Sequence, residues 1–594
     1  MMSDAQRRAI LGVLLLAHMA LASAYSIWNP LAEAPDEADH FAVIRYLAAK
    51  RALPSGPRVT QSKHPPLYYV GAAIAASAGD PLDYAFLRAN PDVSIQPVAH
   101  WSPNFFIHTT LEDWPWRAGP LAFHLARLWS VLLSTLAIWA TYSMVRTGFP
   151  GRDGLALASA GLLAFIPEFS FIGGAVNNDS AAALAGALIL WGALALYQRG
   201  GRWQAAWWTS LAMAFGLLVK VSTAALWPVV ILAAVLGATG AAAQADGNRG
   251  WTRSVRQSWR RWAGSSTVII AAALLIASPW LVRNWRLYGD PLGATMAAQT
   301  IDLRTTSWTM ADTGWLLKGW FVSFWGKFGG AGHIPMPAWI YWVLATAVVA
   351  AAAGLIRVWT RGDERDRPVL FLLALAIACV AIGIWRYSLV ALGTDQGRLL
   401  YPANSAIVTL LAVGSAAWIP LRARRGAAAI AIAAVAALGM YGLAGVIRPS
   451  FAAPPHLTSA ELPPAAATAG MPQFGPLTLI EWQLSETPLL TWYAPHATQD
   501  DLRTVLRVVA DDGAVVWEWR RSPGYGRFST DRWPAGTIID DEYSISWPEW
   551  AGPGIYRLEV GVQLFGGEDF IPTIDGNPPD PDSAYYTLGM IERR

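Results

Sequence analysis

The sequence predicts a polytopic α-helical membrane protein with a β-sandwich domain after its last span. Three observations predict this fold class. The 594 residues are 54% hydrophobic and only 14% charged, whereas soluble chains carry about 25% charged residues. About eleven apolar runs are each long enough to cross a hydrocarbon core of about 30 Å. From about residue 476 onward, shorter runs alternate apolar with polar residues, which is typical of strands.

The first predicted span follows Arg7 and Arg8 directly. It could be a signal peptide, because the small residues at 22–24 offer a cleavage site. The length of the apolar run and the many spans after it favour an uncleaved helix. The predicted spans are residues 9–28, 121–145, 155–173, 178–197, 205–221, 224–242, 264–282, 337–356, 369–390, 401–420 and 427–447.

Arginine in the short loops sets the predicted orientation, because cytoplasmic loops carry an excess of Lys and Arg. With the N-terminus inside, every short cytoplasmic loop is basic, namely RTGFPGRD, QRGGRW, GNRGWTRSVRQSWRRW, RVWTRGDERDRP and RARRG. The other side of the membrane then receives residues 29–120, 283–336, 391–400 and everything after about 448. We therefore expect the C-terminal domain to lie outside the cytoplasm.

Composition divides the chain into three parts. Residues 1–450 carry all the spans, and the first outer loop, 29–120, contains two short helical patterns, PDEADHFAVIRYLAAK and HPPLYYVGAAIAASAG. Residues 451–475 form a Pro- and Ala-rich linker. Residues 476–594 contain short runs such as LLTWYA and YSISW between turn signals such as DDG and SPGYG, which predicts a β-sandwich.

Four ionisable side chains occupy five positions directly after the first span: Asp36, Glu37, Asp39 and His40. Acidic residues favour the first turn of a helix, so one interpretation is purely structural. Asp36, Asp39 and His40 repeat at i, i+3 and i+4, which predicts that they share one helix face. Their place on the outer side, near basic residues of other loops, favours a functional interpretation.

Basic and aromatic residues gather on the same predicted side. Outer arginines are exceptions to the positive-inside rule, and a guanidinium can hold two phosphate oxygens at once. An arginine that only snorkels to the interface is the competing interpretation. An ammonium at the outer end of a span, such as that of Lys220, is a functional candidate by default. The candidate substrate- and phosphate-binding residues are Lys63, His64, Tyr68, Lys220, Arg283, Arg286, Gln396, Arg398 and Tyr401.

Asp179, in the block VNNDSAAALAG, is a possible second acidic site, together with Asp39 and His40. Asn and Asp are preferred N-caps, so the pattern favours a structural role for this block. The sequence contains no HExxH, CxxC or EF-hand motif. No cofactor is therefore assigned, a divalent cation stays open and its ligands are unknown. No nucleic-acid partner is expected.

Six blocks, in order along residues 1–450, resemble those of bacterial GT-C membrane glycosyltransferases. They are most similar to glycosyltransferase family 39, the protein mannosyltransferase and aminoarabinose transferase relatives. The blocks are PDEADHFAVIRYLAAKRALP, KHPPLYY, VNNDSAAALAGALILW, GLLVKVSTA, SPWLVRNWRLYGDPLG and DQGRLLYPA. The resemblance implies a GT-C-like fold in a bacterial inner membrane and an inverting transfer from a polyprenyl-phosphate-linked sugar at the outer face.

The resemblance also implies roles for residues. Asp36 would be the catalytic base and Glu37 would orient the acceptor or assist the base. Arg283, Arg398 and Lys220 would neutralise the leaving phosphate. The acceptor, a glycan, a lipid or a protein, stays open, because many close relatives lack a C-terminal β-sandwich.

Three other functions stay open. One is a lipid-linked-sugar transporter or flippase, although transporters tend to show internal repeats and midplane charges. The second is a polysaccharide polymerase. The third is a pseudoenzyme whose sandwich binds an envelope partner.

Overall fold

The computed structural model describes residues 2–95, 102–200, 203–245, 251–453, 470–567, 570–571, 573–574 and 584–593. The chain divides into two compact units. The first contains the residues up to 29, 34–83 and 117–449, and the second contains 30–33, 84–116 and 450–594. The first long loop of the sequence therefore contributes to both units. Most of the predicted linker at 451–475 lies outside the described residues.

The first unit is a helical bundle. Its helices of ten residues or more are α1 (Asp4–Trp28), α2 (Glu37–Lys50), α3 (Leu67–Ala76), α4 (Ala118–Gly148), α5 (Asp153–Phe165), α7 (Asp179–Gln198), α8 (Trp203–Val219), α9 (Trp227–Ala245), α10 (Trp251–Tyr288), α12 (Met310–Trp325), α13 (Ala338–Arg361), α14 (Arg367–Ser388), α15 (Asn404–Ala416) and α16 (Arg424–Tyr441). The shorter elements are η1 (Thr60–Lys63), α6 (Pro167–Gly173), η3 (Val221–Leu226), α11 (Ala294–Ala297), β1 (Lys327–Phe328), β2 (Ile334–Pro335), η4 (Glu364–Asp366), η5 (Gly397–Ala403), η6 (Gly442–Ile447) and α17 (Arg448–Ser450).

All the predicted spans coincide with helices, but two of them are not simple spans. Within the described ranges, nine helical segments are long and apolar enough to cross a membrane, or ten if the bent pair α5–α6 is one span. That pair bends by 66° at Ile166, because a proline, Pro167, disfavours helical backbone in the residue before it. Helix α8 has 17 residues, about 25 Å, which is short for a hydrocarbon core. The predicted count of about eleven is therefore corrected to nine or ten.

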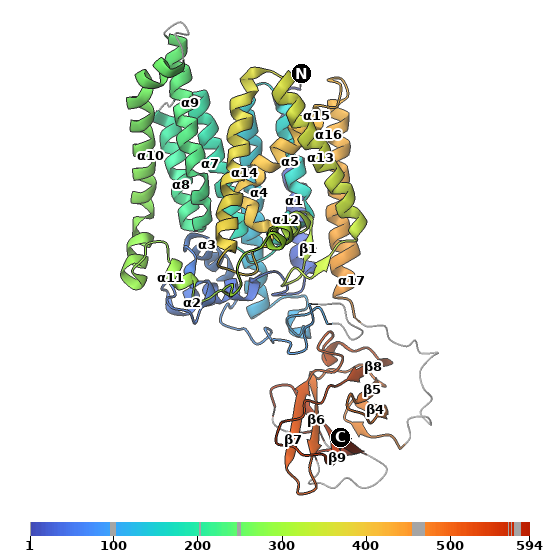
Figure 1. The fold of residues 1–594 in the computed structure, drawn as a ribbon. Helices are drawn as coiled ribbons and strands as arrows, with labels where there is room; N and C mark the ends of the chain where they lie inside the picture. Colours follow the sequence, from blue (N-terminus) through green and yellow to red (C-terminus); the bar gives the residue numbers. More distant parts are fainter. Residues whose placement is uncertain are drawn as a thin grey trace. The chain divides into compact units, whose positions relative to one another are not determined.

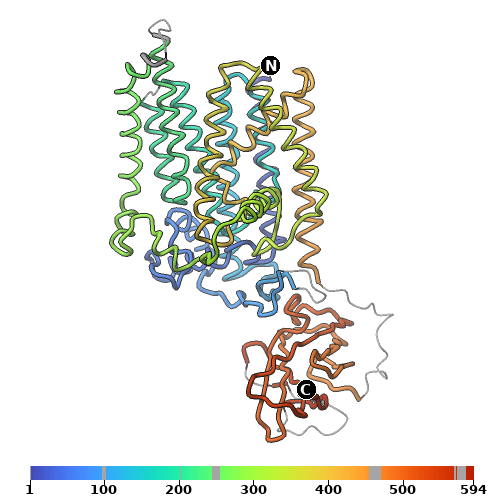
Figure 2. Tube along the Cα trace, viewed as in Figure 1, coloured from blue at the N-terminus to red at the C-terminus, as the bar shows by residue number. Residues whose placement is uncertain are grey.

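The short helices of the first loop lie at one end of the bundle. In Figure 1, α1 runs from the N-terminus to the opposite end of the bundle, where α2 and α3 lie. Both short helices form as the sequence predicts, and α3 packs on α2 and α4. Helix α7 is central: 83% of its most apolar 18-residue stretch is buried inside the protein. It packs against α4, α8 and α9. Figure 2 shows α8, α9 and α10, in green, grouped at one edge of the bundle.

The second unit is built on two antiparallel sheets, with strand orders β10-β3-β4-β5-β8 and β11-β9-β6-β7. Strand β6 is central in its sheet, where Leu506 lies opposite Trp519 of β7 and Val560 of β9. The strands are β3 (Gln473–Phe474), β4 (Leu477–Gln483), β5 (Leu489–Ala494), β6 (Leu502–Val509), β7 (Val515–Arg521), β8 (Thr537–Glu542), β9 (Gly554–Leu564), β10 (Thr573–Ile574) and β11 (Tyr586–Arg593). Two short helices, η2 (Thr110–Glu112) and η7 (Thr530–Arg532), complete the unit.

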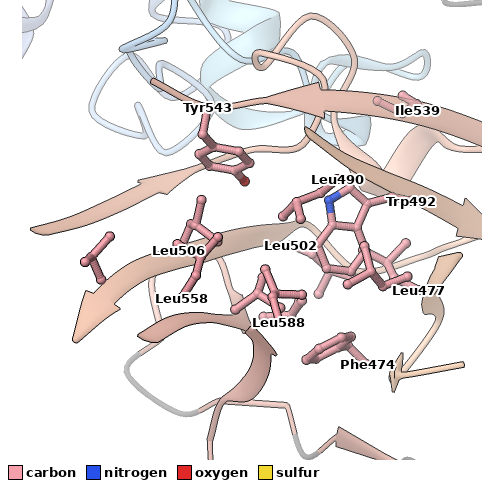
Figure 3. Packing of buried hydrophobic residues seen from close by; sticks show 14 of the residues in the cluster. Phe474, Leu477, Leu490, Trp492, Leu502, Leu506, Ile539, Tyr543, Leu558 and Leu588 are labelled. Carbon is pink, nitrogen blue, oxygen red and sulfur yellow. The ribbon is translucent and has the colours of Figure 1, made fainter. Parts of the chain in front are cut away.

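Apolar residues of both sheets pack into one core, as Figure 3 shows. Trp492 of β5 packs there with Leu506 and Leu558 of the other sheet, and burying a large apolar side chain contributes about 1.5–3 kcal/mol. The two antiparallel sheets packed on this core correspond to the β-sandwich that the sequence predicts. The predicted strand at YSISW is wrong, because the strand lies just before it, at Thr537–Glu542, where Ile539 joins the core.

Part of the first loop packs with the C-terminal residues. The Asn90 side chain donates to the Tyr525 carbonyl at 2.9 Å. Thr110 donates to Asp531 Oδ2 from its N–H at 2.8 Å and from its hydroxyl at 2.7 Å. The sequence groups residues 29–120 with the spans, whereas the structure places residues 84–116 in the second unit.

Gly526 provides a test of this packing. Its φ is +65°, and a Cβ there would lie 2.7 Å from Asn90 Oδ1. We expect Gly526→Ala to speed amide hydrogen exchange at residues 84–95 and to leave exchange in β6 and β9 unchanged. Gly513→Ala is the matched control, because its φ is +87° but it faces open space, so it carries only the left-handed backbone cost of about 1–2 kcal/mol. Equal exchange at residues 84–95 in the two variants would contradict this role.

A partly buried histidine joins separate parts of the second unit. His108 Nε2 lies 3.1 Å from Glu33 Oε1, and its Nδ1 lies 2.9 Å from Glu112 Oε1. Glu33 is fully buried and also accepts the Phe106 N–H at 2.8 Å. Burial disfavours the imidazolium, but the two carboxylates outweigh it and raise the pKa of His108 to about 9. At neutral pH the charged ring therefore donates to both carboxylates.

This cluster predicts a loss of local stability in alkali. A raised pKa in the folded state means that the stabilisation is fully present below the ordinary histidine pKa of about 6.5 and is lost as pH rises through about 9. We expect amide exchange at residues 102–116, corrected for its intrinsic pH dependence, to accelerate across that range. His108→Gln should remove the effect, and a variant that keeps the wild-type pH profile would exclude His108 as its source.

Candidate functional site

The helix in the acidic stretch after α1 begins two residues later than the predicted pattern, which starts at residue 35. Helix α2 starts at Glu37, and Asp36 is its N-cap residue, with a left-handed φ of 59° and no side-chain cap bond. Asp is one of the few residues other than glycine that adopts this conformation. The prediction that Asp36, Asp39 and His40 share one helix face is therefore corrected. Asp36 lies outside the helix, and its carboxylate reaches Arg398 instead.

Two carboxylates and two cations form what we call the charged centre: Asp36, Asp179, Lys220 and Arg398. Arg398 Nη2 donates to Asp36 Oδ2 at 2.5 Å, and its Nη1 donates to Asp179 Oδ2 at 2.9 Å. Arg398 Nε donates to Gln396 Oε1 at 2.5 Å. Lys220 Nζ donates to the other oxygen of Asp179. The structure therefore brings together five of the residues that the sequence singles out.

Helix ends and a close contact position the centre. Asp179 begins α7, Lys220 immediately precedes η3, and Arg398 lies in η5. A Cβ at Gly186 of α7 would lie 2.0 Å from the Pro402 carbonyl oxygen in η5. Only glycine allows α7 and η5 to approach this closely, which holds Asp179 and Arg398 within hydrogen-bond distance.

The two carboxylates of the centre have different environments. The Asp179 side chain is 1% exposed and each of its oxygens holds a cation. The Asp36 side chain is 46% exposed, and Arg398 is its ion-pair partner within the described residues. Loss of water opposes the charge on Asp36, but the charge and hydrogen bond of Arg398, together with other nearby groups such as Lys220, outweigh it and hold the pKa of this carboxyl below its ordinary value. Asp36 is therefore an ionised carboxylate that solvent reaches.

Histidine and tyrosine side chains pack beside the centre. His40 Nδ1 lies 2.7 Å from the Tyr69 hydroxyl, and the His40 and His64 rings stack with centroids 5.9 Å apart. Burial lowers the pKa of His40 to about 3 and holds that of His64 well below its ordinary value. Both rings are therefore neutral at neutral pH. The Tyr68 hydroxyl is turned to Ser130 Oγ, 2.8 Å away.

Lys63 and Asp39 lie close to the centre but outside it. Lys63 Nζ donates to Thr300 Oγ1 at 3.2 Å, and burial lowers its pKa against the opposing charges of Asp36 and Asp39. Burial raises the pKa of Asp39, while a hydrogen bond with the Thr60 side chain opposes that shift. Burial therefore opposes the charge on each of these two side chains beside the centre.

Arg283 and Arg286 line a groove at the end of α10. Arg283 Nη2 donates to the carbonyls of Leu53 and Pro54 at 3.2 and 2.7 Å. The structure therefore gives Arg283 backbone partners and does not bring it to Asp179 with Arg398 and Lys220. The groove has a volume of about 630 Å³ and is lined by Ser55, Ser278, Pro279, Val282, Arg283, Arg286 and Leu287.

Glu37 is buried and fully paired. Arg127 donates to its two oxygens from Nε and Nη2, both at 2.7 Å, and the Val176 N–H donates at 2.7 Å. Arg127 is itself fully buried and donates to the Ser26 and Asn29 carbonyls at 2.6 and 2.8 Å. Glu37 therefore ties α2 to α4 and to the end of α1, a placement that favours a positioning role over contact with an acceptor.

Sequence reasoning missed two buried charged residues. Arg127 and Glu168 each lie inside an apolar run, which is the signal that singles out Lys220. Glu168, in the bent pair α5–α6, is 2% exposed and accepts a backbone N–H at 3.0 Å. Tyr401 is 1% exposed, and its ring packs on Phe169 at 5.6 Å. The structure therefore places Tyr401 in the buried packing between η5 and α6.

The centre combines an accessible carboxylate with two fixed cations. Such a site can accept a proton at Asp36 while Arg398 and Lys220 stabilise an anion. Among the described residues, no group of three or more His, Cys, Asp or Glu side chains is arranged to hold a metal ion.

No family model and no curated protein matches this chain. Solved structures that resemble it include the Archaeoglobus fulgidus oligosaccharyltransferase in complex with Zn and sulfate, at 14% identity and a TM-score of 0.39, over 74% of this chain and 53% of that one. Another is ArnT from Cupriavidus metallidurans in the apo state, at 15% identity and a TM-score of 0.32, over 70% and 78%. The chain thus spans about half the length of the archaeal enzyme. Both are of the GT-C type that the sequence blocks resemble, but likenesses this weak assign neither a family nor an activity.

Proposed function

We propose that the protein transfers a sugar from a polyprenyl-phosphate donor to an acceptor hydroxyl, with inversion, at the outer face of a bacterial inner membrane. The observation that carries this proposal is the charged centre, in which the half-exposed Asp36 lies beside two cations fixed by Asp179. The basic short loops support a cytoplasmic N-terminus, with the centre and the C-terminal unit on the other side. The acceptor stays open among glycans, lipids and proteins.

In this reaction Asp36 is the base. The acceptor oxygen attacks the anomeric carbon from the side opposite the phosphate, which inverts that carbon, and its proton passes to the Asp36 carboxylate. The bond between the anomeric carbon and the phosphate oxygen breaks, and the phosphate leaves with the electron pair. Arg398 and Lys220 stabilise the second negative charge that develops on the phosphate, and cations fixed in advance are most effective there.

The surrounding residues have supporting roles. Gln396 orients Arg398 through the bond to its Nε. Glu37 is a positioning residue that fixes the start of α2, next to Asp36, through Arg127. The groove with Arg283 and Arg286 lies along α10, where Leu275 and Trp285 are 73% and 62% exposed. Such a surface suits the lipid part of the donor.

A comparison of lipid-linked sugars and glycans between the source strain and a deletion strain tests the proposal. We expect the deletion strain to accumulate one polyprenyl-phosphate sugar and to lack that sugar on one glycan, lipid or protein, and the wild-type chain to restore it. The purified chain should also move labelled sugar from donor to acceptor in a detergent-solubilised membrane extract. A transporter would restore the strain but fail in detergent, which would contradict the proposal.

A further inference from the structure

The charged centre is electrically balanced before any donor binds. The positive charges of Arg398 and Lys220 are matched by the negative charges of Asp36 and Asp179. All three nitrogens of the Arg398 guanidinium already donate to side-chain oxygens. An incoming phosphate therefore meets no spare positive charge in the centre, and the Arg398 N–H groups directed at Asp36 and Asp179 are already in use.

We propose that the donor phosphate binds by displacing Asp36 from Arg398 and that this exchange frees Asp36 to act as the base. The inference rests on the proposed function and adds an order of events to it. The two carboxylates on Arg398 are not equivalent. Asp179 is 1% exposed and held by both cations, whereas Asp36 is 46% exposed and accepts from Arg398 through Oδ2.

The backbone around Asp36 also allows the exchange. Asp36 lies outside α2 in the left-handed region and makes no side-chain cap bond. Helix α2 is fixed instead by Glu37, through its bonds to Arg127 and Val176. Moving the Asp36 side chain therefore costs the ion pair with Arg398 and leaves the helix anchored.

The exchange couples donor binding to the activity of the base. While Arg398 holds Asp36, the guanidinium stabilises the carboxylate charge and makes it a weaker proton acceptor. A phosphate oxygen on Arg398 Nη2 replaces one negative charge by another, and Asp36 becomes available to the acceptor. The donor therefore binds before productive acceptor binding. After transfer, the return of Asp36 to Arg398 assists release of the phosphate product.

Binding of polyprenyl phosphate to the full-length protein in nanodiscs tests this exchange. Asp36→Asn should bind about two- to fivefold more tightly than the wild type, because a partly exposed competing charge is gone. Asp39→Asn is the matched control, because it replaces a carboxyl group of the same segment whose side chain is not one of the Arg398 partners. Its Kd should change by less than about twofold. Asp36→Ala is a second variant with the same expected direction.

For Asp179→Asn the expected change in affinity has the opposite sign to that of the Asp36 variants. It removes the carboxylate that holds both cations, so it should weaken the binding of polyprenyl phosphate. Unchanged or weaker binding by both Asp36 variants would overturn the exchange, and so would equal tightening by Asp39→Asn. If the wild type and every variant fail to bind polyprenyl phosphate, the proposed function itself is wrong, which distinguishes the two failures.

Discussion

Asp36→Asn is expected to lower the rate of sugar transfer at least about 100-fold, because a positioned general base contributes about 10²–10⁴-fold. The neutral amide cannot take the proton of the acceptor hydroxyl. The amount of folded protein in the membrane should stay at the wild-type level, because the side chain is 46% exposed and does not cap α2. The measurement is the initial rate of label transfer from a polyprenyl-phosphate donor, divided by the amount of folded protein.

Asp39→Asn is again the control, because Asp39 lies three residues from Asp36, inside α2, and outside the charged centre. Its transfer rate should stay within about threefold of the wild type, an effect of surface charge alone. A wild-type rate in Asp36→Asn would exclude Asp36 as the base. If Asp36→Asn instead lost both transfer and binding of polyprenyl phosphate, the residue would be needed for structure and not for proton transfer.

The helices could be predicted from the sequence because a membrane span needs little more than an apolar run of sufficient length. Two predicted spans differ from the structure, the bent pair α5–α6 and the short helix α8, and each difference has a local cause. The break at Ile166 follows from Pro167, a signal that was present in the sequence. Helix α8 ends at Val219 because Lys220 has an extended backbone before η3, and a hydropathy pattern cannot show where an apolar helix stops.

The charged centre could be predicted only as separate candidates. Arg283 and Arg398 give the same signal in sequence, each an arginine on the predicted outer side. Their roles in the structure differ because helix ends from distant parts of the chain meet at Arg398, where Asp36 and Asp179 converge. At Arg283 the nearest partners are backbone carbonyls. One sequence carries no record of such contacts.

Glu37 shows a different limit. Next to Asp36, it looks in sequence like half of a catalytic acidic pair. Its partner Arg127 lies 90 residues away, in the middle of an apolar stretch, and only the packing of α2 against α4 brings the two together. The two adjacent carboxylates therefore have opposite environments, one half-exposed and one fully buried.

Glu37→Gln is expected to destabilise the protein by about 3–5 kcal/mol, because it leaves the buried guanidinium of Arg127 without its counter-charge. Both side chains are 0% exposed, so water cannot replace the lost charge. The midpoint of thermal unfolding in detergent should fall, and the amount of folded protein with it. Transfer per folded molecule should fall far less than in Asp36→Asn, because Glu37 acts by positioning α2.

A double variant separates this positioning role from catalysis. Glu37→Gln combined with Arg127→Gln removes both charges, and it should recover part of the stability lost in Glu37→Gln, because an uncompensated buried charge costs more than a neutral polar pair. A catalytic Glu37 would give the opposite pattern. Its single variant would stay stable but inactive per folded molecule, and removal of Arg127 would restore nothing.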